Sequence, residues 1–322
     1  MRIVIFTDVD SLTTARLVRA TLQLARAGEP GRVVGFVTTR PDSFGYGARR
    51  HLRSFARRLV ETAANSEVPL RGIVDTGLDL FRLGRRHGIP VLVPPTGDPN
   101  DPAFIGELVA KVRPDLALSY FCKQRLSPRL RSVFAHAVNY HDGLCPHYRG
   151  VMATSFSIFA GESKSGFTFH HMTDRFDAGP ILFQDAVSID GDSHLRAVSH
   201  DKSRLAVAAL PRLLELLAGG DPGRPQCGKG SYFSAHDWMA LTHLAHPANA
   251  TRGQILLRIR AFGVVHLTIE GHSYPVTRLR SSRPGERLAF RTADDKRLRP
   301  DRFWGLPALF HRGVAPIADL HP

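Results

Sequence analysis

Cysteine is scarce in this chain of 322 residues, which contains only Cys122, Cys145 and Cys227. Three cysteines that lie far apart form neither a disulfide framework nor a paired metal site. The sixteen histidines are scattered, and the neighbours His170 and His171 face opposite sides of a strand. We therefore predict no structural or catalytic metal.

Long apolar runs are also absent, so no segment has the length of a membrane-spanning helix. The apolar start, MRIVIF, stops at Thr7 and is too short for a signal peptide. The sequence lacks GxxxxGK[ST], and no GxGxxG follows the first strand, so nucleotide-driven chemistry and hydride transfer lose support. We expect a soluble, cytoplasmic protein with no membrane partner.

Acidic residues are outnumbered, with 29 Asp and Glu against 43 Lys and Arg, which gives a net charge of +14. The basic residues are mostly arginine and occur along the whole chain. This pattern favours a solvated arginine-rich surface, and the alternative is a face for tRNA or for phosphate-bearing substrates. The aromatic and basic interleaving typical of single-strand binding is absent.

Strands and helices alternate through the first two thirds of the chain, which predicts a doubly wound, mostly parallel, Rossmann-like α/β sheet. The predicted strands are 2–7, 32–38, 89–93, 115–120, 136–141, 166–172 and 180–187, and the predicted helices are 11–28, 76–87, 103–113, a short one from Ser127, 149–161 and 193–218. Residues 40–71 are polar and basic, and we interpret them as an elaboration of unknown role.

A boundary is predicted after Gly219 and Gly220, a helix stop signal. Residues 1–220 then form a catalytic domain, 221–234 a linker rich in proline and glycine, and 235–322 a smaller β-rich carboxyl-terminal domain. Within the latter we expect a helical turn around Trp238, a helix near 251–262, and short strands with a hairpin turn at Gly271.

Three polar residues carry the chemistry. Asn139 and His141 lie two apart in one strand, so both side chains face the same way. They sit at its carboxyl end, where open α/β sheets bind ligands. Asp177 follows in a later loop. An amide donor, an imidazole and a carboxylate suit acyl transfer to an amine, which needs an oxyanion donor, a proton handler and an anion to hold it.

The motifs around these residues resemble those of the folate-dependent formyltransferases. The family pattern is Asn-x-His, a Leu-x-Pro-x-Tyr-x-Gly loop and a later Asp-x-Gly, and here it reads Asn139 and His141, then Leu144-Cys145-Pro146-His147-Tyr148-Arg149-Gly150, then Asp177-Ala178-Gly179. The run AGESKSGFTFHHM before Asp177 is also similar to the family's. Residues 252–277 resemble the small carboxyl-terminal domain of the tRNA and sugar enzymes.

The resemblance implies N10-formyltetrahydrofolate as formyl donor and Asn139, His141 and Asp177 as catalytic residues. It also implies a donor-binding set, which consists of Phe121, Cys122, Lys123, Gln124, Arg125, Leu126, Asp174 and Gly179. The implied substrate loop consists of Leu144, Pro146, Tyr148, Arg149 and Gly150.

The acceptor stays open at this point. An N-formyltransferase for the amine of a small metabolite, such as a nucleotide-linked amino sugar or a natural-product building block, is favoured because Asp142 and Cys145 depart from the loop of the tRNA enzyme. Methionyl-tRNA formyltransferase and a formyltetrahydrofolate hydrolase are the alternatives, although the hydrolase's usual amino-terminal regulatory domain is not evident. A non-catalytic folate or RNA binder is disfavoured. The oligomeric state, a homodimer included, cannot be derived from the sequence.

Overall fold

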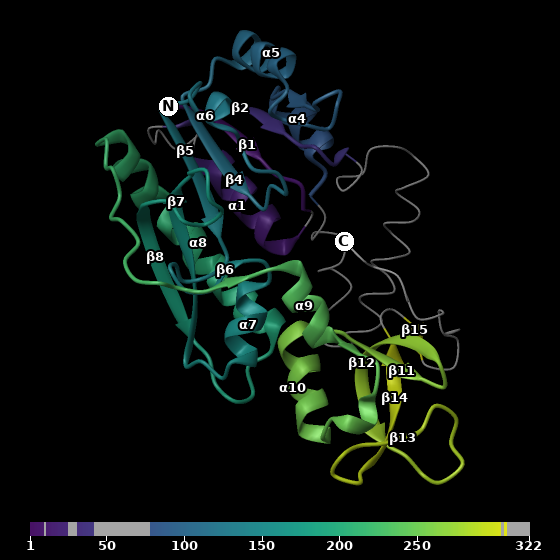
Figure 1. Ribbon diagram of the computed structural model, residues 1–322. Helices are drawn as coiled ribbons and strands as arrows, with labels where there is room; N and C mark the ends of the chain where they lie inside the picture. The colour runs from purple at the N-terminus through teal and green to yellow at the C-terminus, as the bar shows by residue number, and fades with distance from the viewer. Residues whose placement is uncertain (10, 25–30, 42–77, 304–305, 308–322) are drawn as a thin grey trace.

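The computed structural model of the chain describes residues 1–9, 11–24, 31–41, 78–303 and 306–307. Most of the predicted elaboration at 40–71 lies outside these residues. A seven-stranded sheet forms the centre of the larger part, in the order β3-β2-β1-β4-β5-β7-β8 (Figure 1). Its first five strands are parallel, and β7 and β8 are antiparallel to their neighbours. The prediction of a mostly parallel α/β sheet is confirmed.

Most predicted elements are present with shifts of a few residues at their ends. The strands are β1 (Arg2–Phe6), β2 (Arg32–Val37), β3 (Val91–Leu92), β4 (Leu116–Tyr120), β5 (His136–His141), β6 (Arg149–Gly150), β7 (Lys164–His171) and β8 (Ile181–Ser188). The helices are α1 (Leu12–Leu24), α4 (Leu80–His87), α5 (Pro102–Val112), α6 (Pro128–Arg131), α7 (Ala153–Phe159) and α8 (Leu195–Ala218).

Local signals explain where the helices begin and end. Asp101 accepts hydrogen bonds from two backbone N–H groups at the start of α5, and Pro102 occupies the first turn, where its missing N–H costs nothing. Gly88 ends α4 in the left-handed conformation, at φ 64°. These caps pair some of the terminal backbone groups that have no partner within the helix.

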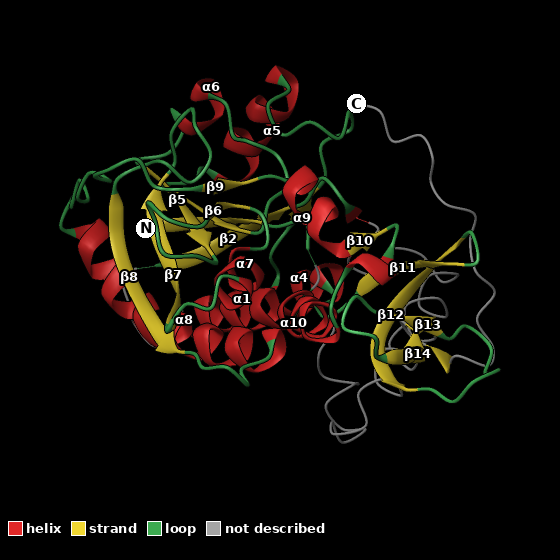
Figure 2. Ribbon diagram, turned by 60° about the horizontal axis from the view of Figure 1, so that its bottom comes forward, coloured by secondary structure: helices red, strands yellow, loops and turns green. Residues whose placement is uncertain are grey.

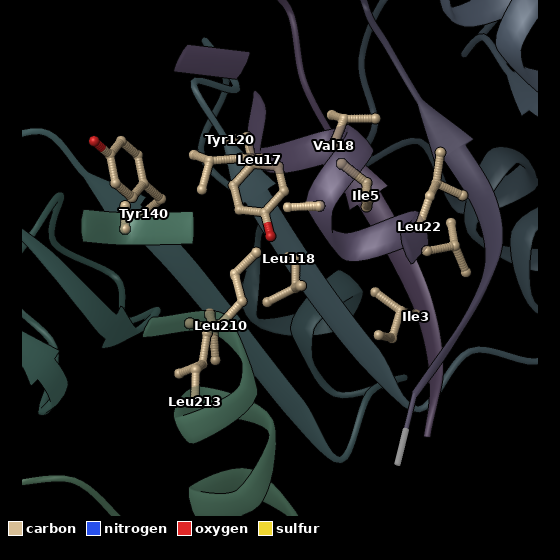
Figure 3. Close-up of a cluster of buried hydrophobic side chains, with 14 of the residues drawn as sticks. Ile3, Ile5, Leu17, Val18, Leu22, Leu118, Tyr120, Tyr140, Leu210 and Leu213 are labelled. Carbon is tan, nitrogen blue, oxygen red and sulfur yellow. The ribbon is translucent and has the colours of Figure 1, made fainter. Parts of the chain in front are cut away.

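Alternate side chains of the strands supply two cores, one on each face of the sheet. Ile3 and Ile5 of β1 pack with α1 and α8, while Val4 and Phe6 pack with α5 and α6. Figure 2 shows these helix pairs on opposite sides of the sheet, and Figure 3 shows the core beneath α1 and α8. Both faces of the strands are therefore buried, and polar side chains gather at the strand ends.

The carboxyl-terminal part forms a second sheet in the order β10-β11-β12-β14-β13, with β15 paired to β14. Its elements are β9 (Tyr232–Phe233), α9 (Ala235–Thr242), β10 (His243–Leu244), a 3-10 turn (Pro247–Asn249), α10 (Arg252–Phe262), β11 (Val265–Ile269), β12 (His272–Ser281), β13 (Phe290–Arg291), β14 (Arg297–Phe303) and β15 (Leu306–Pro307). A separate apolar cluster, which includes Ile255, Val265 and Val276, stabilises it. The predicted β-rich carboxyl-terminal region is therefore present.

The predicted helix over 149–161 is wrong at its start. Arg149 and Gly150 form β6, which pairs with β9 of the expected linker, and α7 begins only at Ala153. A Cβ on Gly150 would lie 2.1 Å from the backbone oxygen of Phe233, so only glycine permits this pairing. Phe233 then stacks on Phe156, with ring centroids 4.0 Å apart, and joins the two parts of the molecule. The division of the chain into domains at 220 and 235 stays a prediction.

Candidate functional site

Four polar side chains meet where β5 and β7 lie side by side. Asn139 and His141 come from β5, and the antiparallel register places His170 of β7 directly opposite Asn139. Asp177 enters from the loop between β7 and β8. We call Asn139, His141, His170 and Asp177 the polar cluster. His141, His170 and Asp177 are 6%, 2% and 9% exposed, so their charges interact with little screening by water.

Asp177 is the centre of the polar cluster. Its Oδ2 lies 3.4 Å from Nδ1 of His141 and accepts a hydrogen bond from the N–H of Gly150 at 2.9 Å, while Oδ1 lies 3.5 Å from Nε2 of His170. Burial raises the pKa of Asp177, but the two imidazoles and the N–H of Gly150 outweigh burial and lower the pKa to about 2. The carboxylate is therefore ionised at neutral pH.

The surroundings of His141 determine which proton it can hold. Its Nε2 lies 2.7 Å from the carbonyl oxygen of Tyr148, and its Nδ1 faces the carboxylate of Asp177. Both partners accept hydrogen bonds, and a neutral imidazole has only one N–H to donate. Both contacts are satisfied together only when the ring is protonated, so this arrangement suits a proton donor.

The amide of Asn139 is held within the same network. Its Nδ2 donates to Oδ1 of Asp177 at 3.2 Å and lies 3.2 Å from Nε2 of His170. The contact with Asp177 engages one N–H bond, at the long end of the usual range, and the roles in the contact with His170 depend on which nitrogen of that ring carries a hydrogen. Asn139 can turn an N–H toward a ligand oxygen by releasing one of these two contacts.

The loop that carries Asp177 is anchored from several sides. Gln226 donates through Nε2 to the carbonyl oxygens of Asp177 and Gly179, each at 2.8 Å. A Cβ on Gly179 would lie 1.8 Å from the carbonyl oxygen of His171, so the loop can approach β7 only with glycine there. Asp177 itself has φ 52°, in the left-handed region. The contacts around it stabilise this uncommon conformation.

A cavity of about 2300 Å³ opens beside the polar cluster, whose four residues all lie in its wall. Pockets for a single drug-sized ligand are roughly 300–1,000 Å³, so this space admits two substrates together. The wall reaches from the carboxyl ends of β4 and β5 to the beginning of α8, to α10 and to β12. The carboxyl-terminal part of the chain therefore contributes to the site.

Most of the predicted donor-binding residues lie in this wall, namely Phe121, Cys122, Lys123, Gln124, Arg125 and Leu126. The backbone N–H groups of Gln124, Arg125 and Leu126 donate to no other described residue, and all three residues line the cavity. A heterocycle with several acceptor atoms could satisfy them. Burial raises the pKa of the Cys122 thiol well above its usual range, which disfavours the thiolate form.

The other predicted residues lie elsewhere. Asp174 is exposed and pairs with Arg131 outside the cavity. Gly179 lies against the carbonyl oxygen of His171 in β7. In the predicted substrate loop only Gly150 lines the cavity. Tyr148 stacks on Phe233, and Arg149 donates to the carbonyl oxygen of Lys229, so this part of the loop holds the segment after α8.

His170 is the cluster member that the sequence interpretation missed. Its Nδ1 lies 2.8 Å from the carbonyl oxygen of His171, which orients Nε2 toward Asn139 and Asp177. His170 belongs to the run AGESKSGFTFHHM before Asp177, and its position in that family-like run was the sequence signal that could have identified it. Only the pairing of β5 with β7 shows that it faces Asn139.

No group of three or more His, Cys, Asp or Glu side chains in the described ranges is arranged to hold a metal ion. Within the same ranges, no helix has the length and apolarity needed to cross a lipid bilayer.

A family model described as "Formyl transferase" matches residues 1–214. GDP-perosamine N-formyltransferase of Brucella melitensis is 33% identical over 129 residues, which is 40% of this chain and 50% of that protein. The chain thus spans about half the length of the curated relatives it matches.

Two solved structures share the fold. One is a sugar N-formyltransferase from a Shewanella species, with a TM-score of 0.60 at 19% identity over 86% of this chain and 96% of that one. The other is a 4-N formyltransferase from Francisella tularensis, with a TM-score of 0.58 at 17% identity and the same two coverages.

Proposed function

The chain belongs to the formyl transferase family, and we propose that it moves a formyl group from N10-formyltetrahydrofolate to the primary amine of a nucleotide-linked amino sugar. One observation carries this proposal: Asn139, His141, His170 and Asp177 meet in the wall of a cavity large enough for both substrates. The backbone N–H groups at 124–126, which donate to no other residue in the described ranges, suit the pterin of the donor, which is rich in acceptor atoms.

The proposed reaction forms a bond between the acceptor nitrogen and the formyl carbon and breaks the bond from that carbon to N10 of the donor. One proton passes from the amine to the released nitrogen. The donor supplies a formyl group already at the oxidation level of the product, so no reductant is needed. The chain has to orient two substrates, stabilise charge on the formyl oxygen and transfer one proton.

We assign these tasks within the polar cluster. The Nε2–H of a protonated His141, once it releases the Tyr148 carbonyl, and the Asn139 amide, once it releases one of its contacts, stabilise charge on the formyl oxygen. The ionised Asp177 stabilises the imidazolium and, through a water, helps to carry the amine proton. His170 orients Asn139 and Asp177 through its Nε2.

The charges of the cavity wall support an anionic acceptor. It contains six basic side chains, which are Lys123, Arg125, Arg175, Arg196, Arg260 and Arg278, and three acidic ones, which are Asp142, Asp177 and Asp201. Two of the acidic side chains already face cations within the protein, Asp142 facing Lys202 and Asp177 facing the imidazoles. Among the basic side chains, Arg278 pairs with Asp301. The wall therefore attracts phosphate groups.

Exposed apolar side chains give the same wall a second property. Phe176, Tyr232, Met152 and Leu256 are large, 37–54% exposed, and all line the cavity. Apolar and aromatic surface beside arginine suits a base and a diphosphate in one molecule. The names of the relatives in Brucella and Shewanella agree with a sugar acceptor.

The test follows release of tetrahydrofolate from N10-formyltetrahydrofolate, first without an amine and then with a panel of amines. The panel contains nucleotide-linked amino sugars, the same sugars without nucleotide, amino acids and methionyl-tRNA. We expect release only with the nucleotide-linked sugars. Release without any amine would indicate a hydrolase, and release with methionyl-tRNA alone would establish the tRNA enzyme instead.

A further inference from the structure

Lys202 of α8 is fully buried, which is rare for a lysine. Its Nζ lies 3.0 Å from Oδ1 of Asp142, and it donates to the carbonyl oxygens of Asp142 at 2.9 Å and Gly166 at 3.1 Å. It also donates to Oγ1 of Thr154 in the first turn of α7. The ammonium therefore joins four segments of the chain, and each of its hydrogens has an acceptor.

Asp142 connects this lysine to the polar cluster because it is the next residue after His141. Its carboxylate also accepts hydrogen bonds from the buried hydroxyl of Tyr140 at 3.0 Å and from Thr154. The residues on both sides of His141 thus take part in one hydrogen-bond network, Tyr140 through its hydroxyl and Asp142 through its carboxylate and its carbonyl oxygen. We call Lys202, Asp142, Thr154 and Tyr140 the lysine clamp.

Stability alone does not account for this ion pair, in which Lys202 is fully buried and the Asp142 side chain is 23% exposed. The cost of removing two charges from water commonly equals or exceeds their attraction, and apolar replacements of such pairs are often neutral or stabilising. Burial lowers the pKa of Lys202, while the facing carboxylate of Asp142 opposes that effect. What the pair provides is directional contacts, which an apolar core could not supply at the end of β5.

We propose that Lys202 is a positioning residue for the formyl transfer, since its clamp on Asp142 holds the His141 ring between Tyr148 and Asp177. The inference rests on the proposed function. It depends on two sets of contacts. The Nζ of Lys202 donates to the carbonyl oxygen of Asp142. The His141 ring lies 2.7 Å from the carbonyl oxygen of Tyr148 and 3.4 Å from the carboxylate of Asp177. A small shift of the strand end breaks both ring contacts.

The test separates kcat from KM in variants of the clamp. Lys202→Met keeps the length and apolar stem of the side chain and removes the charge. We expect kcat to fall about 30- to 100-fold, because a misplacement of about 1 Å can cost about a hundredfold. KM for donor and acceptor should stay within about threefold, since the basic and apolar parts of the wall are unchanged.

Thr154 offers a milder pair of variants for the case that Lys202→Met does not fold. Thr154→Val removes the hydroxyl at nearly constant shape, and Thr154→Ser retains it. We expect kcat of the serine variant to exceed that of the valine variant about tenfold. Arg212→Gln is the matched control, because it removes an exposed ion pair with Glu215 from the same helix, and its kcat should equal that of the wild type.

Two results would overturn the proposal: kcat of folded Lys202→Met within about threefold of wild type, or equal kcat for the two Thr154 variants. If the wild type shows no turnover with any amine, the proposed function fails and crystal structures test the clamp by themselves. The Lys202→Met structure should then show the His141 ring displaced by about 0.5 Å or more from its place beside Asp177, the tolerance of such sites. An undisplaced ring would refute the clamp.

Discussion

The low pKa of Asp177 predicts a specific loss of stability on acidification. Its pKa falls from 3.8 to about 2 in the folded chain, which corresponds to about 2 kcal/mol at about 1.4 kcal/mol per pH unit. The folded state keeps the carboxylate ionised where the unfolded chain binds a proton. This contribution to the free energy of unfolding is therefore complete above pH 3.8 and is lost as the pH falls through about 2.

Asp177→Asn removes the charge and keeps the shape of the side chain. In urea unfolding followed by circular dichroism, we expect the variant to be about 2 kcal/mol less stable than the wild type at pH 6. The difference should shrink between pH 4 and pH 2, because the wild type loses its advantage there. Asp192→Asn is the control, since that exposed carboxylate accepts no hydrogen bond from another described residue.

A stability difference that stays constant with pH would refute the reasoning. It would mean that Asp177→Asn acts through packing and not through the attraction of the carboxylate to His141 and His170. Equal stability of variant and wild type at pH 6 would be just as decisive, because the pKa of Asp177 in the folded state could then not be as low as about 2.

Three further predictions concern the site and the core. Asn139→Ala and His141→Ala should each reduce turnover about a hundredfold to a thousandfold with an unchanged circular dichroism spectrum, and near-normal turnover would show that the site is wrongly assigned. Gly179→Ala should lower the free energy of unfolding by about 1–3 kcal/mol, because its Cβ would meet the carbonyl of His171 at 1.8 Å; an unchanged urea midpoint would contradict this. Leu213→Ala should lower the free energy of unfolding by about 2–5 kcal/mol, since Leu213 is fully buried beneath the sheet (Figure 3). A smaller loss would mean that neighbouring side chains fill the space that the leucine leaves.

The sequence predicts the larger sheet well because its signals are local. Continuous apolar strands such as 116–120 and capped helices such as α5 identify themselves within a few residues. The start of α7 was predicted wrongly, because Arg149 and Gly150 pair with Tyr232 and Phe233 more than 80 positions later. A contact at that distance leaves no periodic pattern in the chain.

The functional site likewise contains residues that local signals identify and residues that only tertiary contacts identify. Asn139 and His141 can be paired from the sequence, because two positions in one strand share a face. His170 joins them only through the antiparallel register of β7, and Lys202 reaches Asp142 only through the packing of α8 beneath the sheet. Each of these residues, taken alone, looks like an ordinary histidine or a surface lysine.

The arrangement of the cavity explains why the chemistry is easier to derive than the acceptor. Asn139, His141 and His170 lie near the ends of β5 and β7, where the backbone register determines each position. The basic and apolar wall residues include Arg196 in the first turn of α8, Tyr232 in the segment between α8 and α9, and Arg260 in α10. Substitutions there leave the sheet intact, so the acceptor can change while the reaction is retained. Exchange of these wall residues, and not of the cluster, is therefore the route by which this fold would select a different amine.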